Sequence, residues 1–582
     1  MSRNDEVASV LEEFADRLEA TGVEYKPTAY RRAAENVRDH PTPIEALVED
    51  GAEAVRGIDR VGDAIAAKIV EYVRTGSIEE LEELRAELPV EIGALTRVEG
   101  VGPKTVGTLY EELGITTLDE LAAAAEAGKI REITGFGETT EENIRENVPF
   151  ARQARERERL GDARPIADAA VTYLADADPV ATLEVCGSIR RWRDTIGDVD
   201  LLVGSDEHEA VVAAFTDWPE ADAVIEAGTN KASVRTDGLR VDLRVVAVAE
   251  FGAALQYFTG SRDHNIAVRN RALDRGLKVN EYGVFDVSDV ADPDAGQRVG
   301  DRIAGETEAG VYAALDMSWV PPELRENTGE VAAAAAGSLP ALIEEGDVRG
   351  DLHTHTDWSD GDDSIETMVA AAAERGYDYH AVTDHATGPG VFGNAGLDPD
   401  DLAEQAKAVD AVREDAPIPV FHGVEANITA DGDLATDDGT LASLDLVVAS
   451  PHAALGTSDD ATDRLIRAIE HPEVDVLGHP TGRLINRREG LTVDFERLAE
   501  AAVREGVAIE VNANPARLDA NGEAVHAAVD AGATVVINTD AHTPREFDHV
   551  RYGVHTARRG WAERADVLNA RSADGVRSFL EE

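Results

Sequence analysis

The sequence has a single cysteine, Cys186, in 582 residues, which excludes an internal disulfide framework and favours a reducing compartment. It has only seven lysines, at positions 26, 68, 104, 129, 231, 278 and 407. It also lacks the run of about 20 apolar residues that a membrane-spanning helix needs. Its charged first residues, MSRNDEV, are unlike a secretory signal. These absences predict a soluble cytoplasmic protein.

The charge balance is strongly acidic, with 115 acidic and 55 basic residues and a formal net charge of -60. Phosphate binding depends on Lys and Arg, so this charge alone argues against a polyanionic partner. The acidic residues are spread through every segment, however, which favours adaptation to a salt-rich cytoplasm and hence a halophilic source. At about 1 M salt the Debye length is only ~3 Å. Local placement of Arg and Lys therefore says more about the ligand than the net charge does.

The length of 582 residues exceeds what one hydrophobic core can organise and predicts a multidomain enzyme. Short amphipathic patterns predict an all-α region to about residue 150, divided into a small domain at 1–85 and a further region at 86–150. An α+β domain is predicted at 151–320, with strands near 181–187, 198–204, 231–236 and 239–248. A Pro-containing, Ala-rich linker with one helical piece follows at 321–345. Seven strands alternating with helices predict a parallel α/β barrel at 346–582.

Three glycine turns recur in the helical region, at 60–62, 100–102 and 135–137, each directly before a predicted helix. Such a turn presents unpaired backbone N–H groups at the positive end of the helix dipole and can hold a DNA phosphate without side-chain charge. The candidate glycines are Gly62, Gly100, Gly102, Gly135 and Gly137. An ordinary C-capping glycine of the preceding helix is the alternative for any single copy. The repetition favours a helix-hairpin-helix DNA contact, which the pattern resembles.

The α+β region carries two carboxylates at alternate strand positions, Asp198 and Asp200, preceded by the small pair Gly187-Ser188. Side chains i and i+2 of a strand point to the same face, so the two carboxylates can share divalent cations. Gly187 lets backbone N–H groups approach phosphate oxygens, and a third strand carboxylate follows at Asp242. In-line phosphoryl transfer uses two cations about 3.5–4 Å apart, so the set indicates nucleotidyl transfer.

The order and spacing of these residues, with Arg190-Arg191 and Tyr257-Phe258-Thr259-Gly260-Ser261, resemble the family X DNA polymerases from the N-terminus to about residue 327. The resemblance implies a polymerase beta-like nucleotidyltransferase that uses Mg²⁺ or Mn²⁺, gapped or nicked DNA and dNTPs, as a monomer in base excision repair. It implies phosphate binding by Ser188 and Arg191, space at Gly197 and orientation of Asp242 by Arg240. It also places Tyr257, Phe258 and Gly260 at the incoming sugar, Asn265 at the incoming base and Arg269 at the template. An aromatic core pair with solvated polar residues is the alternative for these last positions.

Lys26 and Lys68 resemble positions of the small N-terminal domain of this family, where a lysine forms a Schiff base with a deoxyribose phosphate. Lys68 is the candidate nucleophile, and such a lysine needs a depressed pKa. Lys26 is a candidate DNA contact. Arg60 and Ala64 depart from the pattern of relatives, which often carry glycine and lysine there. A phosphate contact or a solvated side chain is the alternative role for Lys68.

Nine nitrogen and oxygen donors lie at or near predicted barrel strand ends: His353, His355, Asp360, His385, Glu425, His452, His479, Asp540 and His542. Nine donors are enough for three metals, and a set without thiolate suits Mn²⁺, Zn²⁺ or Fe²⁺. A bridging carboxylate holds two metals, and Glu425 is the candidate for that position. The other histidines are interpreted as core or surface residues.

The segment from about 346 to 582 resembles the PHP phosphoesterase domain, which family X polymerases of prokaryotes often carry. The resemblance implies 3′-end processing as 3′–5′ exonuclease, 3′-phosphatase or abasic-site endonuclease. Arg483, Arg487 and Arg488 are candidates for gripping DNA, with a solvated loop as the alternative. Two other functions stay open: a gap-recognition scaffold with inactive centres, and a small-molecule phosphatase joined to a polymerase.

Overall fold

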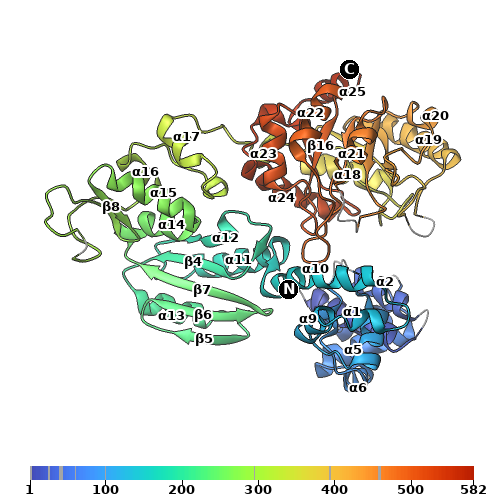
Figure 1. The fold of residues 1–582 in the computed structure, drawn as a ribbon, viewed down its shortest axis with the longest axis horizontal. Helices are drawn as coiled ribbons and strands as arrows, with labels where there is room; N and C mark the ends of the chain where they lie inside the picture. The colour runs from blue at the N-terminus through green and yellow to red at the C-terminus, as the bar shows by residue number, and fades with distance from the viewer. Residues whose placement is uncertain are drawn as a thin grey trace. The chain divides into compact units, whose positions relative to one another are not determined.

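The computed structural model describes residues 3–23, 26–38, 44–58, 60–98, 100–293, 295–391, 395–455 and 460–581 (Figure 1). The chain divides into two compact units. One comprises Met1–Glu158 with Asn486–Arg488, and the other Arg159–Ile485 with Glu489–Glu582. No helix in the described ranges has both the length and the apolarity of a bilayer-spanning segment.

The first unit is helical, as the sequence predicts. Its helices are α1 (Arg3–Ala20), α2 (Lys26–Arg38), α3 (Ile44–Asp50), α4 (Ala52–Val55), α5 (Asp63–Thr75), α6 (Glu79–Glu87), α7 (Ile92–Leu95), α8 (Pro103–Leu113), α9 (Leu118–Glu126), η1 (Ile130–Glu132) and α10 (Glu138–Glu156). Apolar residues at helical spacing form two cores, one from Val7 to Leu84 and one from Leu88 to Ala151. Residues of each core lie within or beside at least one of the three glycine turns.

The three glycine turns share one backbone conformation. Their first residues lie in the left-handed region: Arg60 at φ 58°, Gly100 at φ 81° and Gly135 at φ 96°. Their third residues, Gly62, Gly102 and Gly137, are extended and begin α5, α8 and α10 without a side-chain cap. The first turn thus keeps the conformation of the other two although an arginine replaces its leading glycine. The helix N-termini after these turns keep backbone N–H groups that no capping side chain satisfies.

The left-handed conformation gives a stability prediction for Gly100. Gly100→Ala is expected to lower the free energy of unfolding by about 1 kcal/mol, because a Cβ disfavours φ 81° even where space is open. Gly102→Ser is the matched control: φ there is −77°, and serine is a good N-cap, so stability is expected to be unchanged or higher. Urea denaturation followed by circular dichroism measures both, and equal destabilisation of the two variants would contradict the assigned turn.

The second unit begins with the predicted α+β domain. After the short β1 (Glu158–Arg159), its elements are α11 (Leu160–Ala175), β2 (Thr182–Val185), α12 (Gly187–Arg190), β3 (Thr195–Ile196), β4 (Val199–Gly204), α13 (His208–Thr216), β5 (Ala223–Ala227), β6 (Lys231–Thr236) and β7 (Leu239–Val246). The five-stranded sheet has the order β2-β4-β7-β6-β5, and β4 and β7 run parallel at its centre. Apolar and polar residues alternate along β7, so its polar side chains share the open face of the sheet.

A smaller helical and β subdomain follows. It contains η2 (Val248–Glu250), α14 (Phe251–Thr259), α15 (Arg262–Leu273), β8 (Leu277–Asn280), β9 (Gly283–Asp286), β10 (Asp301–Ala304), α16 (Glu308–Ala314), η3 (Pro322–Leu324) and α17 (Glu330–Ala336). Val320, Leu324 and Ala334 belong to the same core cluster as Val268 and Val311. The first part of the segment interpreted as a linker, 321–345, therefore packs on this subdomain, because its apolar residues have a surface to cover there.

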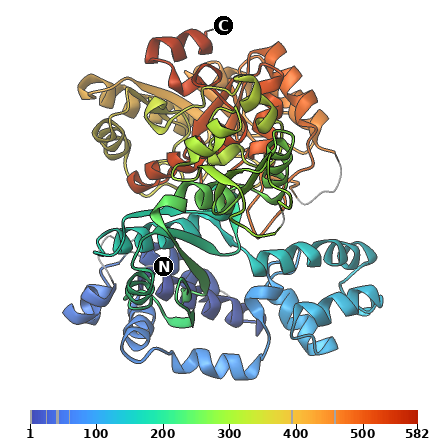
Figure 2. The same cartoon turned by 90° about the vertical axis from the view of Figure 1, so that its left-hand side faces the viewer.

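The C-terminal barrel is confirmed, and it runs from yellow to red in Figures 1 and 2. Its strands are β11 (Gly350–Asp351), β12 (Tyr379–Val382), β13 (Val420–Asn427), β14 (Leu446–Ser450), β15 (Val476–Leu477), β16 (Ala508–Asn512) and β17 (Val535–Asn538). All seven are parallel and lie in chain order. Every residue of these strands is buried, as in a sheet covered on both faces.

Among the described residues, six helices, α18 to α23, connect the barrel strands; η4 precedes the first strand, and the others follow the last. In chain order, these helical elements are η4 (Glu345–Asp347), α18 (Ile365–Arg375), α19 (Pro399–Asp415), α20 (Asp438–Leu441), α21 (Thr462–Ile469), α22 (Phe495–Glu505), α23 (Gly522–Asp530), η5 (Pro544–His549), α24 (Val550–Arg559), η6 (Arg564–Asp566), η7 (Leu568–Ala570) and α25 (Ala573–Leu580). A parallel bridge between Thr354 and Ala541 joins the segments that follow the first and last strands. The sheet is thus nearly closed, and all seven carboxyl ends face one cavity.

Candidate active sites

Three carboxylates meet on the open face of the central sheet. Asp198 directly precedes β4, Asp200 lies in β4, and Asp242 lies beside Asp200 in the parallel register of β4 and β7. One oxygen of each lies within 4.8 Å of one oxygen of each of the others. The structure thus brings together the three aspartates that the sequence singled out.

Mutual repulsion among these three carboxylates favours the binding of cations between them. Burial and the neighbouring Asp198 and Asp242 raise the pKa of Asp200 to about 7. Arg240 donates from Nε to Oδ1 of Asp242 at 2.7 Å and from Nη2 to Oγ of Ser233 at 3.0 Å. Arg240 therefore contacts Asp242 directly, and three carboxylate oxygens so close together are hard ligands suited to divalent ions.

Gly187 lets the following turn lie against Asp200. Its φ is +62°, and an added Cβ would lie 2.2 Å from Oδ2 of Asp200. The preceding Cys186 donates its N–H to the carbonyl of Asp200 at 2.8 Å, and Ser188 follows half-buried in α12. Only glycine permits this close approach of the turn to a carboxylate.

Arg191, the candidate phosphate ligand, contacts protein groups in this structure. It donates to Oε1 of Glu326 at 2.9 Å and to the carbonyl of Thr259 at 2.7 Å. Its neighbour Arg190 pairs with the buried Glu308 at 2.8 Å. Gly197 lies in the short connection between β3 and β4. The guanidinium of Arg191, which the sequence assigns to a triphosphate, is thus paired with the carboxylate of Glu326.

The residues predicted to face the sugar lie at the end of α14. Tyr257 and Phe258 pack edge to face with ring centroids 5.2 Å apart, and Arg244 stacks 4.3 Å from the Phe258 centroid. An added Cβ at Gly260 would lie 2.7 Å from Oδ1 of Asn265. Close packing explains the glycine, and the two aromatic rings pack on each other.

Asn265 and Arg269 both lie on α15. The Asn265 amide donates to the carbonyls of Tyr257 at 2.7 Å and Gly260 at 3.2 Å, and accepts from Gln256 at 3.0 Å. Asn265 thus holds the turn after α14, whereas the sequence predicts a contact with the incoming base. Arg269 is exposed, so its assignment to the template stays a prediction.

Two basic residues of this site escaped the sequence interpretation. Lys231 and Arg244 are opposite each other in the β6–β7 register. They line one cavity together with Asp200, Asp242 and Phe258. Arg244 is two residues after Asp242 on the same strand face, and that spacing is a signal that the sequence already contained.

Lys68 contacts an acidic and an aromatic side chain. Its side-chain nitrogen pairs with Glu80 and lies 4.7 Å from the centroid of Phe14. These contacts give the lyase hypothesis no support. Lys26 is exposed at the start of α2, and its contact with DNA stays a prediction.

The glycines before the three helices are not required by the fold. An added Cβ at Gly62, Gly102 or Gly137 meets nothing within 4 Å, and none of them has a positive φ. Open space in front of uncapped N–H groups is what an approaching phosphate needs. Asp63 and Glu138 follow two of these glycines, whereas Lys104 lies in the first turn after Gly102. The turn at 100–102 therefore has the most favourable charge for a phosphate.

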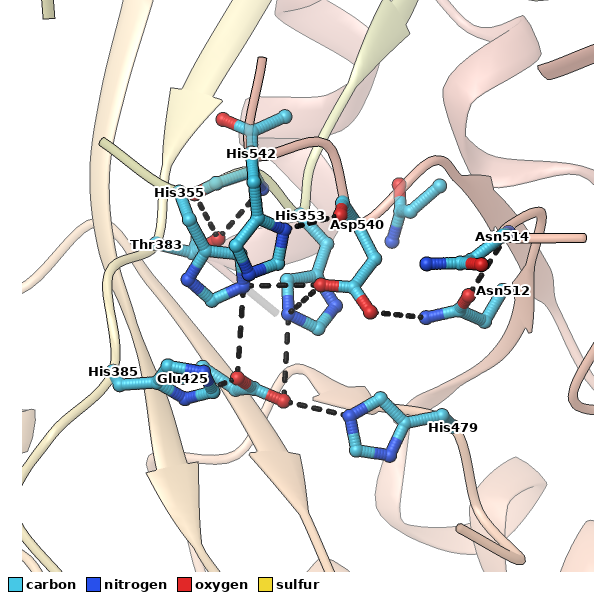
Figure 3. Close-up of polar contacts among 12 residues, drawn as sticks. His353, His355, Thr383, His385, Glu425, His479, Asn512, Asn514, Asp540 and His542 are labelled. Carbon is cyan, nitrogen blue, oxygen red and sulfur yellow. Dashed lines mark hydrogen bonds and ion pairs between the residues drawn. The ribbon is translucent and has the colours of Figure 1, made fainter. Parts of the chain in front are cut away.

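The nine predicted donors of the barrel lie at or near the carboxyl ends of its strands. Figure 3 shows His353, His355, His385, Glu425, His479, Asp540 and His542 of this set. His353 and His355 follow β11, His385 follows β12, His452 follows β14 and His479 follows β15. Glu425 lies near the end of β13, Asp540 and His542 follow β17, and Asp360 lies in the loop after β11. The parallel barrel places all of these segments at one end of the sheet.

Glu425 is the centre of this cluster. Its carboxylate has five histidine neighbours: His385 at 2.7 Å, His479 at 2.9 Å, His452 at 3.3 Å, His353 at 3.4 Å and His355 at 3.7 Å. Burial alone raises the pKa of Glu425, but the surrounding histidines hold it well below its usual value. Glu425 is thus a fully buried carboxylate between imidazoles, and its role as a bridging ligand stays a prediction.

The two other carboxylates extend the cluster on either side. Asp360 lies 3.3 Å from His385 and 3.5 Å from His542, and Asp540 lies 3.1 Å from His355. Three groups of candidate ligands have donor atoms within 4.8 Å of one another. They are His355-Asp360-His385-His542, His353-His355-Glu425 and His385-Glu425-His452.

Buried atoms that make no hydrogen bond support a metal site in this cluster. Among the described residues they include Nε2 of His353, both ring nitrogens of His355, Nδ1 of His385, Oε2 of Glu425, Nε2 of His452 and Nδ1 of His479. Buried polar atoms normally find partners, and nitrogen and oxygen donors suit borderline or hard divalent metals. The residues present thus fit a multinuclear metal site.

Further residues orient the histidines, and the sequence interpretation did not single them out. Glu510 of β16 lies 2.8 Å from Nδ1 of His353, and Asn427 lies 2.7 Å from Nδ1 of His452. Such partners fix the tautomer and ring orientation of a metal-binding histidine. A polar residue among the apolar residues of a buried strand is the sequence signal that could have identified Glu510 and Asn427.

The arginines proposed to grip DNA differ in their surroundings. Arg483 donates to the carbonyls of Arg517 and Leu518 and pairs with Asp194 at 2.9 Å. These contacts indicate that the guanidinium of Arg483 stabilises the fold. Arg487 and Arg488 cluster with the first unit by their backbone contacts, and a DNA contact there stays a prediction.

Four family profiles match the sequence. They are a helix-hairpin-helix domain at 2–78, a SAM-like helix-hairpin-helix tandem at 92–147, a DNA polymerase beta thumb at 254–326 and a PHP domain at 351–514. Their order along the chain agrees with the helical turns, the α14–α17 subdomain and the barrel. The helix-hairpin-helix, polymerase beta-like and PHP interpretations are confirmed.

Similar proteins include relatives of the whole chain and of its parts. The sequence is 24% identical to DNA polymerase lambda of Rattus norvegicus over 348 residues, 56% of each chain. It is 32% identical to the probable phosphatase YcdX of Escherichia coli O127:H6 over 213 residues, 33% of this chain and 78% of that protein. It is 35% identical to the DNA polymerase/3'-5' exonuclease PolX of Bacillus subtilis (strain 168) over 582 residues, 99% of each chain. This protein therefore belongs to the PolX family, in which a family X polymerase region precedes a PHP domain.

Proposed function

We propose that the protein is a DNA-directed DNA polymerase that fills short gaps during base excision repair and trims DNA 3′ ends in its barrel. The observation that carries the proposal is the parallel register that sets Asp200 beside Asp242, with Asp198 and the Gly187 turn against them. The name of the full-length Bacillus relative supports both activities. Gapped DNA and dNTPs are the proposed substrates.

At the sheet, the residues bind and orient the reactants. Asp198, Asp200 and Asp242 would hold Mg²⁺ or Mn²⁺, which supply charge neutralisation and activation of an oxygen nucleophile. The Gly187 turn presents backbone N–H groups, and Ser188 and Arg191 supply donors for the β and γ phosphates. Lys231 and Arg244 add positive charge along the same cavity. Tyr257 and Phe258 would confine the sugar.

In the barrel, Glu425 and its histidine neighbours would hold Mn²⁺, Zn²⁺ or Fe²⁺, which supply a nucleophile at neutral pH and polarise a phosphate. Glu510 and Asn427 keep His353 and His452 oriented. Arg517 lies 3.6 Å from Asp540 and is partly exposed, so it can meet a substrate phosphate. The barrel geometry supports phosphodiester or phosphomonoester hydrolysis, hence exonuclease, 3′-phosphatase or abasic-site endonuclease activity.

Close contact with Asp200 makes Gly187 a sharp test of the polymerase site. Gly187→Ala is expected to reduce dNTP incorporation by roughly a hundredfold, because its Cβ would overlap the Asp200 carboxylate and shift it by about 1 Å. Gly238→Ala is the control: φ is also positive there, but nothing lies within 4 Å of an added Cβ. Steady-state incorporation into gapped DNA measures both variants, and equal activities would contradict the assigned turn.

The turn at 100–102 is proposed as the strongest hairpin contact with DNA. Gly102→Ser is expected to weaken gapped-DNA binding several-fold, because the hydroxyl would satisfy the helix N–H groups and fill the open approach. Gly137→Ser should weaken it less, because Glu138 and Glu141 already disfavour a phosphate there. Fluorescence anisotropy at fixed salt compares the two, and the reverse order would contradict the charge argument.

A small-molecule phosphatase is the second candidate for the barrel, favoured by the 32% identity to the probable phosphatase YcdX. Turnover of a 3′-phosphorylated oligonucleotide and of p-nitrophenyl phosphate by the same preparation separates the two. The proposed function predicts preference for the oligonucleotide.

A 5′-labelled primer at a one-nucleotide gap tests the proposed function as a whole. Extension by one nucleotide with the complementary dNTP, and shortening without it, is the expected result. Several KCl concentrations up to a few molar are included, because the net charge of -60 indicates a salt-rich cytoplasm, which stays a prediction. Absence of both reactions across Mg²⁺, Mn²⁺ and KCl would favour the gap-recognition scaffold.

A further inference from the structure

Barrel residues contact the segment that follows Gly187-Ser188, the turn proposed to bind the nucleotide. Residues 191–194 come directly after α12, and three of the four contact barrel residues. Arg559 at the end of α24 donates from Nη1 to the carbonyl of Arg191 at 2.9 Å. Arg483 pairs with Asp194 at 2.9 Å.

Trp192 makes the third of these contacts. Its ring stacks on His555 of α24, with centroids 3.7 Å apart and an interplanar angle of 4°. Arg164 and Arg551 lie over the same ring at 4.6 and 5.3 Å. Trp192 is 6% exposed and has φ 54°, an uncommon conformation for a large residue. The surrounding contacts are what hold it there.

A shared carboxylate links these contacts to the candidate phosphate ligand. Glu326 accepts from Arg191 at 2.9 Å and lies 3.5 Å from both Arg193 and Arg559. When Arg191 turns to a triphosphate, Arg193 and Arg559 remain to balance the charge of Glu326. The Arg559 side chain is 10% exposed, so water replaces its contacts poorly.

We propose that Arg559 is a positioning residue for polymerisation: from the barrel, it fixes the backbone of Arg191 and holds Glu326 when Arg191 binds the nucleotide. The barrel fold is then part of the dNTP site, independently of its own metal cluster. This inference rests on the proposed role of Arg191 at the triphosphate.

Steady-state kinetics on gapped DNA with the full chain test the proposal. Arg559→Met is expected to raise the KM for dNTP roughly tenfold with a smaller change in kcat, because ground-state positioning of Arg191 is lost. Arg559→Lys, which can still donate to the Arg191 carbonyl, should recover part of this loss. Exonuclease turnover of single-stranded DNA is expected to stay within about twofold in both.

Arg497→Met is the matched control, since Arg497 is an exposed barrel arginine that pairs with Asp463 at 2.6 Å, away from residues 191–194. It should leave the KM for dNTP unchanged. An unchanged KM in Arg559→Met, with the fold intact by circular dichroism, would overturn the proposal. If Arg559→Met fails to fold, Asp194→Asn, which weakens the same set of contacts from the other side, must raise the KM for dNTP or the proposal is overturned.

Arg191→Ala separates this inference from the proposed function. If Arg191→Ala also leaves the KM for dNTP unchanged, the assignment of the triphosphate site is wrong. If it raises the KM and neither Arg559→Met nor Asp194→Asn does, only the positioning role fails.

Discussion

Asp242→Asn is expected to lower dNTP incorporation into gapped DNA by roughly a thousandfold while leaving 3′ trimming within about twofold of wild type. Asp242 is one of three carboxylates whose oxygens lie within 4.8 Å of one another. An amide keeps its shape but removes the charge that draws cations into the cavity, and it weakens the contact with Arg240. The barrel ligands lie on other strands and are untouched by the change.

Asp206→Asn is the control for this substitution. Asp206 is exposed two residues beyond the end of β4 and belongs to no described ligand group, so both activities should persist. Incorporation of a labelled nucleotide and shortening of a 5′-labelled strand are measured on the same preparation. Near wild-type incorporation by Asp242→Asn would remove the carboxylate trio from the proposed chemistry.

Glu425→Gln is expected to have the opposite effect, with roughly a thousandfold loss of 3′ trimming and retained polymerisation. Glu425 is fully buried and lies within 4.0 Å of five histidines, so the proposed bridging position depends on its carboxylate. A neutral amide there leaves the imidazoles without the negative charge that favours bound cations. Bound metal, measured by mass spectrometry after dialysis, should fall with the activity.

Glu404→Gln is the matched control, because Glu404 is an exposed barrel residue that pairs with Lys407 on the same helix. It should keep both metal and activity. Loss of polymerisation in Glu425→Gln, with the same circular dichroism as wild type, would contradict separate centres.

The separation of the two centres does not come from a free linker. The sequence interpretation placed a linker at 321–345, but 321–336 packs on the α14–α17 subdomain, and His555 and Arg558 of α24 contact Glu323 of η3. Independence of the two chemistries rests instead on their different ligand sets. The contact of Arg559 with the Arg191 carbonyl adds a dependence of polymerisation on the barrel fold.

Much of the ligand geometry could be predicted from the sequence, because strand chemistry is local. Asp198 and Asp200 share a face by their i, i+2 spacing, and donors at the ends of parallel barrel strands must converge. The strands and the nine donors follow from these rules. Glu425 at the centre of the histidines agrees with the same reasoning.

Contacts between distant segments could not be predicted in this way. Asn265 and Arg483 were interpreted as ligand-binding residues. In the structure each donates hydrogen bonds to backbone carbonyls that only the folded chain brings near. Glu510 lies in an otherwise apolar strand, and its contact with His353 joins residues 157 positions apart.

One gel tests the central claim most directly: a 5′-labelled primer at a one-nucleotide gap, incubated with and without dNTP, with wild type, Asp242→Asn and Glu425→Gln. Wild type should lengthen the primer with dNTP and shorten it without. Asp242→Asn should only shorten it, and Glu425→Gln should only lengthen it. Loss of both reactions in either folded variant, or survival of both in either one, would contradict two chemically separate centres in one chain.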